Sequence, residues 1–343
     1  MTFDISDPTF VPRMAARDEW LAEVQEEIID PDREIVDPHH HLWDRSGILY
    51  EMEHLWADTG SGHNIVETMF IECRAYYTPD PDEPMRPVEE TRRIAEMAMA
   101  GRDFKDRSQL TGIIAHADLT HPDLDAVLDA HKTAGQGLFK GIRHAGARDP
   151  EPEFLAIPGR GAEGQYAEPA FRKGVARLGE LGLTYDTWQY HHQLPAFTDM
   201  ARAVPGTTLV LDHFSTPLGI GRFKDKRAEI FAQWKDDIAA LAECPNVMVK
   251  LGGMAMVDNG WSWHERDLPP NSDEFVEVMA PWYHHTIACF GPERCMFESN
   301  FPVDRISISY PVLWNGLKKI AADYDEAAQL MMFAETARRV YGL

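Results

Sequence analysis

Short runs of β-branched and aromatic residues recur along the chain, each about as long as one strand and bounded by turn residues. This pattern predicts β-strands. The predicted strands cover residues 34–40, 65–73, 110–119, 138–145, 183–190, 207–214, 247–253 and 295–300.

Segments with the period of an amphipathic helix separate these strands. They cover residues 88–101, 122–134, 168–181, 192–203, 225–243, 272–289, 311–322 and 325–340. Helix start signals support the pattern, because Asp123 and Asp125 fall in a first turn and Ser272 precedes a run of acids. Gly135 and Gly206 fall where helices should stop.

Strands that alternate with helices in this way favour an α/β fold in which one (β/α)8 TIM barrel forms a single domain. We expect the barrel to span residues 34–343 and residues 1–33 to form a polar, acidic leader. A length of 343 residues suits one large barrel, and 44% apolar residues can fill its core. A doubly wound sheet with a second domain is the alternative architecture.

The chain is strongly acidic, with 33 basic and 56 acidic residues and a formal net charge of −23. Such a surface repels nucleic-acid phosphates and anionic lipid headgroups, so neither is an expected partner. A small anionic substrate can still bind in a locally basic pocket.

The sequence also bears on the cellular compartment. The 4 cysteines are scattered, and we expect buried thiols rather than disulfides. No secretory signal and no apolar run of membrane-span length is visible. We therefore expect a cytoplasmic protein, and since acidic barrels of this size often pair, a homodimer.

Two stretches rich in proline, glycine and acids, residues 76–87 and 149–165, follow the second and fourth predicted strands. In a barrel these are loops on the catalytic face, where they shape the access of substrate. A mobile surface insertion is the alternative for each.

The most informative motif is VDPHHHLWD, which closes the first predicted strand. Strand alternation puts Asp37, His39 and His41 on one face and His40 on the other. Two imidazoles at the carboxyl end of a strand can converge on one metal ion or one substrate group. Barrel enzymes place their chemistry at these strand ends, so the motif predicts an active site.

Three further strand ends carry candidate chemistry. At the sixth strand, alternation places His213 at the barrel mouth and Asp212 on the opposite side. At the fourth it turns Arg143 inward, where a guanidinium can clamp a carboxylate or a polarised carbonyl. A salt bridge at the rim is the alternative for Arg143. The eighth strand ends CMFESN, with Glu298 and Asn300 on one face.

These strand ends together resemble the amidohydrolase superfamily, in particular its amidohydrolase-related branch of fuconolactonase-like and 2-pyrone-4,6-dicarboxylate lactonase-like enzymes. The resemblance runs in family order from about residue 34 to the C-terminus. It implies a (β/α)8 barrel and water-dependent opening of a lactone or a similar cyclic ester. The matching motifs are DPHHHLWD, GIRHAG, YDTWQYHHQLP, LDHFSTP, NVMVKLGG and CMFESNFPVD.

The resemblance also implies roles for particular residues. His39, His41 and His213 match the histidines of the site, and Arg143 matches the arginine that binds an anionic substrate group. We expect His191, which follows the fifth strand, to contact substrate as well. Some relatives bind a divalent metal through these histidines, whereas others work without one.

The chain departs from the family at the eighth strand. Relatives place an aspartate there as the general base toward water, and the matching residue here is Asn300. A neutral amide cannot accept that proton. Glu298, two residues earlier on the same face, is the obvious substitute, and Asp304 is another. Asn300 therefore leaves open which carboxylate acts at the site.

Three functions fit these observations. The preferred hypothesis is a hydrolase that opens a lactone of a small, carboxylated substrate with water activated by Glu298. The site would hold one Zn²⁺ or Mn²⁺ ion through His39, His41, His213 and Glu298, or it would work without metal. The alternatives are a metal-dependent decarboxylase of an aromatic acid and a non-catalytic ligand-binding barrel that lost its general base.

Overall fold

The computed structural model describes residues 17–45, 48–79 and 84–343. Its main sheet has eight parallel strands that follow one another in chain order. They are β1 (Glu34–His40), β4 (Asn64–Ile71), β5 (Gln109–Ala115), β6 (Phe139–Arg143), β7 (Thr184–Thr187), β8 (Leu209–Leu211), β9 (Val247–Leu251) and β10 (Cys295–Phe297). This order has no switch point, so the fold is the predicted (β/α)8 barrel and not a doubly wound sheet.

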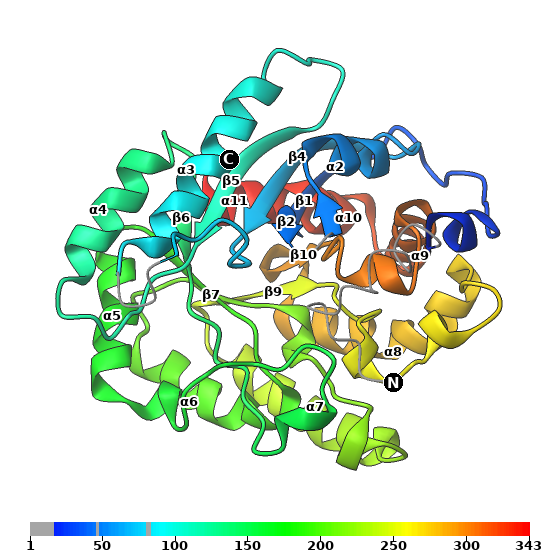
Figure 1. The fold of residues 1–343 in the computed structure, drawn as a ribbon. Coiled ribbons are helices and arrows are strands. Elements are labelled where there is room, and N and C mark those ends of the chain that lie inside the picture. Colours follow the sequence, from blue (N-terminus) through cyan, green and yellow to red (C-terminus); the bar gives the residue numbers. More distant parts are fainter. Residues whose placement is uncertain (1–16, 46–47, 80–83) are drawn as a thin grey trace.

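Helices surround the strands (Figure 1). They are α2 (Met52–Thr59), α3 (Arg86–Gly101), α4 (Leu124–Ala134), α5 (Pro169–Glu180), α6 (Leu194–Ala203), α7 (Arg227–Ala242), α8 (Ser272–Phe290), α9 (Tyr310–Ala321), α10 (Glu326–Leu330) and α11 (Thr336–Tyr341), with a π-helix at Met331–Glu335 between the last two. The predicted helix pattern is confirmed, but the segment at 325–340 is three pieces rather than one. Helix α2 and the short hairpin β2 (Trp43–Arg45) and β3 (Ile48–Tyr50) were not predicted.

Two apolar clusters pack on the two sides of the barrel wall. The outer cluster lies between strands and helices and includes Leu209 and Leu211 of β8. The inner cluster fills the barrel and includes Val36, Val210 and Met296. The strands are therefore buried on both faces, as parallel strands in a barrel usually are.

The barrel closes differently at its two ends. At the mouth, His40 of β1 forms an isolated bridge with Phe301, which follows β10, and the amide of His41 donates to the carbonyl of Phe301 at 2.7 Å. Below it, the described residues of these strands form no ladder. Ala334 and Ala337 of the C-terminal helices enter the inner cluster instead. Helical packing thus completes the wall where strand pairing stops.

The predicted leader lies partly outside the described residues, since residues 1–16 are not described. The part that follows is bound to the barrel. The carboxylate of Glu26 accepts hydrogen bonds from Ser272 and Asn315, and Lys318 donates to the carbonyl of Ile29 at 2.9 Å. Residues of this part therefore pack against α8 and α9.

The predictions for the two long loops, residues 76–87 and 149–165, can be compared with the structure to different extents. Residues 80–83 of the first lie outside the described part. The second is anchored, because Asp258 accepts from the amides of Ala156 and Ile157 at 2.7 and 3.1 Å and Arg222 pairs with Asp149. A mobile insertion does not describe this second loop. Among the described helices, none has the length and apolarity that a membrane crossing requires.

Candidate active site

The first-strand histidines meet at the mouth, but their strand is irregular. Pairing with β4 shifts between Asp37 and His40, so simple alternation fails there. The rings of His39 and His41 lie with centroids 5.0 Å apart. Asp37 does not join them, contrary to our expectation, because its carboxylate accepts from the amide of Ser299 and the hydroxyl of Tyr310, both at 2.9 Å.

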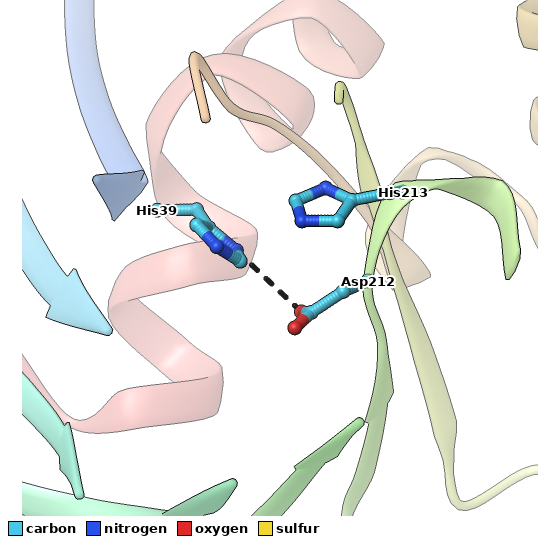
Figure 2. A group of neighbouring side chains, drawn as sticks. All are labelled: His39, Asp212 and His213. Carbon is cyan, nitrogen blue, oxygen red and sulfur yellow. Dashed lines mark ion pairs between the residues drawn. The ribbon is translucent and has the colours of Figure 1, made fainter. Parts of the chain in front are cut away.

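The face predicted for Asp212 is wrong. Val210 belongs to the inner cluster while Leu209 and Leu211 belong to the outer one, so Asp212 points into the barrel. His213 also reaches the site, because the backbone turns left-handed immediately after Asp212. His213, Phe214, Ser215 and Thr216 all have positive φ, from 34° to 62°. Figure 2 shows His39, Asp212 and His213 converging from β1 and from the end of β8.

Alternation could not have revealed this face. The residues from Leu209 to Leu211 are all apolar, whichever side of the barrel wall they face. The pattern therefore does not indicate which of them point into the barrel. A run of left-handed residues without glycine costs free energy at each position, on the order of 1 kcal/mol or more. The loop is held by two side chains that directly follow β7, with Gln189 donating to Ser215 and Trp188 to Thr216, each at 3.0 Å.

Glu298 joins the two histidines. Its carboxylate lies 2.7 Å from Nδ1 of His213 and 2.8 Å from Nδ1 of His39. Burial alone would raise the pKa of Glu298, but the neighbouring His213 and His39 outweigh burial and lower it to about 2. Glu298 is therefore an ionised acceptor, and each histidine is held with its proton on Nδ1.

Two glycines after β9 make room for this arrangement. A Cβ on Gly252 would overlap Cγ of Glu298, and a Cβ on Gly253 would overlap the ring of His213. The pair LGG in the sequence thus has a steric reason, because only residues without a side chain allow the carboxylate and the imidazole to approach β9.

His41 is held by a different partner. Its Nδ1 lies 2.8 Å from the carbonyl of Ile71, which requires a proton on Nδ1 and leaves Nε2 unprotonated. Burial, with smaller effects from the charges of His39 and Arg143, keeps the pKa of His41 well below its usual value. His41 is therefore neutral, with one ring nitrogen available at the site.

Arg143 lies in the cluster, but most of its donors are engaged. Nε and Nη2 donate to Glu72, and Nη1 lies 3.4 Å from both Asp212 and Nε2 of His39. Burial opposes its charge, but Glu72 and Asp212 outweigh burial and raise the pKa of Arg143. Of the five guanidinium hydrogens, one on Nη2 has no partner among the described residues.

A second buried cation lies deeper in the barrel. Nζ of Lys250 is 2.8 Å from Asp186 and 3.3 Å from Oδ1 of Asp212. Burial opposes its charge as well, yet Asp186, Asp212 and Glu298 raise the pKa of Lys250. For Asp212, the charges of Lys250 and His39 outweigh burial and hold its pKa well below the usual range. Asp212 is therefore a buried carboxylate between the guanidinium of Arg143 and the ammonium of Lys250.

The donor set fits a divalent cation. His39, Asp212 and His213 offer ligand atoms that all lie within 4.8 Å of one another. Oδ1 of Asp212 and Oε2 of Glu298 are buried and lack well-aligned hydrogen bonds, although cations or imidazoles lie near both. Among the described residues, Arg143 pairs with Glu72 and Asp212, and Lys250 pairs with Asp186 and Asp212, whereas Glu298 faces only imidazoles within ion-pair distance. Nitrogen and oxygen ligands of this kind suit zinc.

The remaining predicted residues lie at the edge of the cluster. Asn300 has a left-handed backbone, and its amide donates to Asp304 at 2.9 Å. Burial raises the pKa of Asp304 to about 7, and Asp304 also accepts from the amide of Ala255. His191 lies outside the cluster, since its Nδ1 accepts from the amide of Leu218 and its ring packs on Phe223.

Comparison with known proteins now decides the family. A family model described as Amidohydrolase matches residues 36–343. The chain belongs to the amidohydrolase family. It is 28% identical over 341 residues to an uncharacterised protein of Sinorhizobium fredii, covering 92% of this chain and 98% of the relative. It is 26% identical over 316 residues to L-fucono-1,5-lactonase of Burkholderia multivorans, covering 89% of this chain and 95% of the relative.

Solved structures of amidohydrolases share the fold. An amidohydrolase from Burkholderia multivorans with bound zinc superposes with a TM-score of 0.70 at 20% identity, covering 91% of this chain and 100% of that one. Membership of the amidohydrolase family and lactonase-named relatives make the protein a hydrolase, as the motifs implied. Fold and family were thus both predicted from the sequence.

Proposed function

We propose that this amidohydrolase opens a lactone or similar cyclic ester of a small, carboxylated substrate at the mouth of its barrel. The observation that carries the proposal is the carboxylate of Glu298 between Nδ1 of His213 and Nδ1 of His39, at 2.7 and 2.8 Å. The fuconolactonase named among its relatives supports a lactone as the class of substrate.

In the proposed mechanism, His213 is the base and Glu298 its partner. A proton on Nδ1 leaves Nε2 of His213 able to take a proton from water. Glu298 stabilises the imidazolium that forms, as the aspartate does for the histidine of a serine protease. This pair replaces the aspartate that is absent at Asn300. A carboxylate with a pKa of about 2 is itself a weak base, which favours His213 over Glu298 for the proton.

The bond changes follow from this arrangement. The water oxygen bonds to the lactone carbonyl carbon as its proton passes to Nε2 of His213. The bond between that carbon and the ring oxygen then breaks, and the proton on His213 passes to the ring oxygen. The product is the open hydroxy acid. The free Nη2 hydrogen of Arg143 is the donor that remains for the carboxylate arm of the substrate.

His39, Asp212 and His213 are the residues that would hold a divalent ion. Such an ion supplies Lewis acidity, which polarises a carbonyl and acidifies water. Because Nδ1 of His213 faces Glu298, Nε2 would be the ligand atom, and His213 would act as the base only without the ion. In both states Glu298 would hold the imidazoles in one tautomer and orientation.

The test is a panel of small lactones, with and without a carboxylate arm, assayed with metal-stripped protein and with the same protein after addition of zinc. Hydrolysis of at least one carboxylated member, abolished in His213→Gln, is expected. Activity only after zinc addition would assign the cation a necessary part. Absence of hydrolysis in both preparations, with the His213→Gln variant indistinguishable from wild type, would contradict the proposal.

A further inference from the structure

The last helix reaches the active site from below. Helix α11 lies across the end of the barrel opposite the mouth, where Arg338 pairs with Glu34, the first residue of β1, and with Glu67 in the first half of β4. Lys140, at the beginning of β6, donates to the carbonyl of Gly342 at 2.8 Å. These contacts fix the helix at several points of the barrel floor. Figure 1 shows it, in red, crossing behind the central strands.

Tyr341 of this helix projects into the barrel. Its ring is 4% exposed and belongs to the inner apolar cluster. Its hydroxyl donates to Oδ2 of Asp186 at 2.7 Å. Oδ1 of the same carboxylate accepts from the hydroxyl of Thr184 at 2.8 Å, and Lys250 donates to Oδ2 at 2.8 Å. Asp186 is therefore held by three donors from three different elements.

The contacts continue upward to the histidines. Nζ of Lys250 lies 3.3 Å from Oδ1 of Asp212 and 3.4 Å from Nδ1 of His39. Its distance of 5.5 Å from the ring of Tyr341 adds a cation–π contact from below. Asp186 and Lys250 are fully buried, so neither can exchange a lost partner for solvent.

We propose that Tyr341 is a positioning residue of the active site, which fixes the ammonium of Lys250 through Asp186 and thereby the place of Asp212 beside His39. Without the hydroxyl, Oδ2 of Asp186 keeps only Lys250 and Oδ1 only Thr184, so the carboxylate can turn toward Thr184 and take Lys250 with it. Lys250 then shifts relative to Asp212, and His39 loses a fixed neighbour. This inference rests on the proposed function only for its kinetic consequence.

The structural consequence can be measured without any substrate. Tyr341→Phe removes the hydroxyl and keeps the ring in its apolar contacts. Tyr50→Phe is a matched control, because Tyr50 is buried and also donates to a carboxylate at 2.7 Å, but that carboxylate, Asp58, pairs with Arg305 and not with Lys250. The readout is the ring ¹⁵N spectrum of labelled histidine, with His39→Gln and His213→Gln used to assign the two signals.

The signals of His39 are expected to move in Tyr341→Phe and to stay at their wild-type positions in Tyr50→Phe. Thr184→Val removes the hydrogen bond to Oδ1 of Asp186 and is expected to move the same signals. If Tyr341→Phe does not fold, Tyr341→Trp and Tyr341→Leu, which also lack the hydroxyl, take its place, and Thr184→Val tests the link through Asp186. Wild-type histidine spectra in the variants that fold would overturn the proposal, even where thermal stability falls, since Tyr341 would then only pack.

The kinetic consequence is a lower kcat at nearly constant KM. Loss of a supporting partner of a catalytic cluster lowers activity by about 10-fold or more. An equal effect of Tyr50→Phe on kcat would show general loosening of the barrel and count against Tyr341. If the protein opens no lactone, the kinetic comparison fails together with the proposed function, whereas the histidine spectra still decide the position of Lys250.

Discussion

At the scale of single residues, the ionised carboxylate of Glu298 determines what the neighbouring imidazoles can do. Its Oε1 accepts from Nδ1 of His213 and its Oε2 lies 2.8 Å from Nδ1 of His39, so it favours a proton on Nδ1 of each. An amide in its place has only one acceptor oxygen and cannot balance an imidazolium. Glu298 thus both orients the two imidazoles and supplies the negative charge that stabilises an imidazolium.

Glu298→Gln is expected to lower kcat by about 10²–10⁴-fold with little change in KM, because the base loses its charged partner while substrate contacts remain. Steady-state kinetics on any lactone that the panel identifies provides the measurement. Circular dichroism controls for the fold. A variant that turns over at nearly the wild-type rate would remove Glu298 from the mechanism.

Glu298 also predicts a pH dependence of stability. Its pKa is lowered in the folded state to about 2, chiefly because His213 and His39 outweigh the effect of burial. A carboxyl group of this kind stabilises the fold above its unfolded pKa, about 4.3, and the contribution is lost as pH falls toward the folded value. The free energy of unfolding of the wild type should therefore fall more steeply than that of Glu298→Gln between about pH 4.5 and 2. Parallel curves from urea titrations would contradict this.

At the scale of elements, close approach of β9 and β10 creates the site. Gly252 directly follows β9, and the side chain of Glu298 occupies the space that a Cβ on Gly252 would need. Gly252→Ala is expected to displace that carboxylate and to cost about 1–3 kcal/mol of stability, with loss of activity. Urea unfolding and kcat together test this. Gly206→Ala is the matched control, since a Cβ there meets nothing within 4 Å, and equal losses in both variants would refute the steric explanation.

The comparison of sequence and structure is clearest at β8 and at the hairpin. Each predicted strand is present, because buried runs between turn residues have few other interpretations, although most runs continue past the hydrogen-bonded ladder. The side of the barrel wall on which Asp212 lies could not be predicted, because the strand before it is apolar at every position. The strands β2 and β3 have three residues each, too few for a periodic signal. The contact between Tyr341 and Asp186 joins residues 155 positions apart, which no local pattern encodes.

At the scale of the whole molecule, the net charge of −23 acts on stability. Self-repulsion of an acidic surface destabilises the compact state, and salt screens it. Raising sodium chloride from about 20 to about 300 mM is expected to increase Tm by roughly 2–4 °C, the equivalent of about 1 kcal/mol. Differential scanning calorimetry provides the measurement, and a falling Tm would show that attractive ion pairs dominate.

The seam between β1 and β10 gives the molecule a weak side. In the described part of the chain, strand pairing joins these edges only at the mouth, through His40 and Phe301, and helices replace it below. Cooperative units of a protein open in order of their local stability. Detachment of the C-terminal helices would therefore open the lower part of this seam, and Tyr341 would leave Asp186 in the same motion. Hydrogen exchange at the backbone amides of α11 should thus report on the seam and on the support of the histidines together.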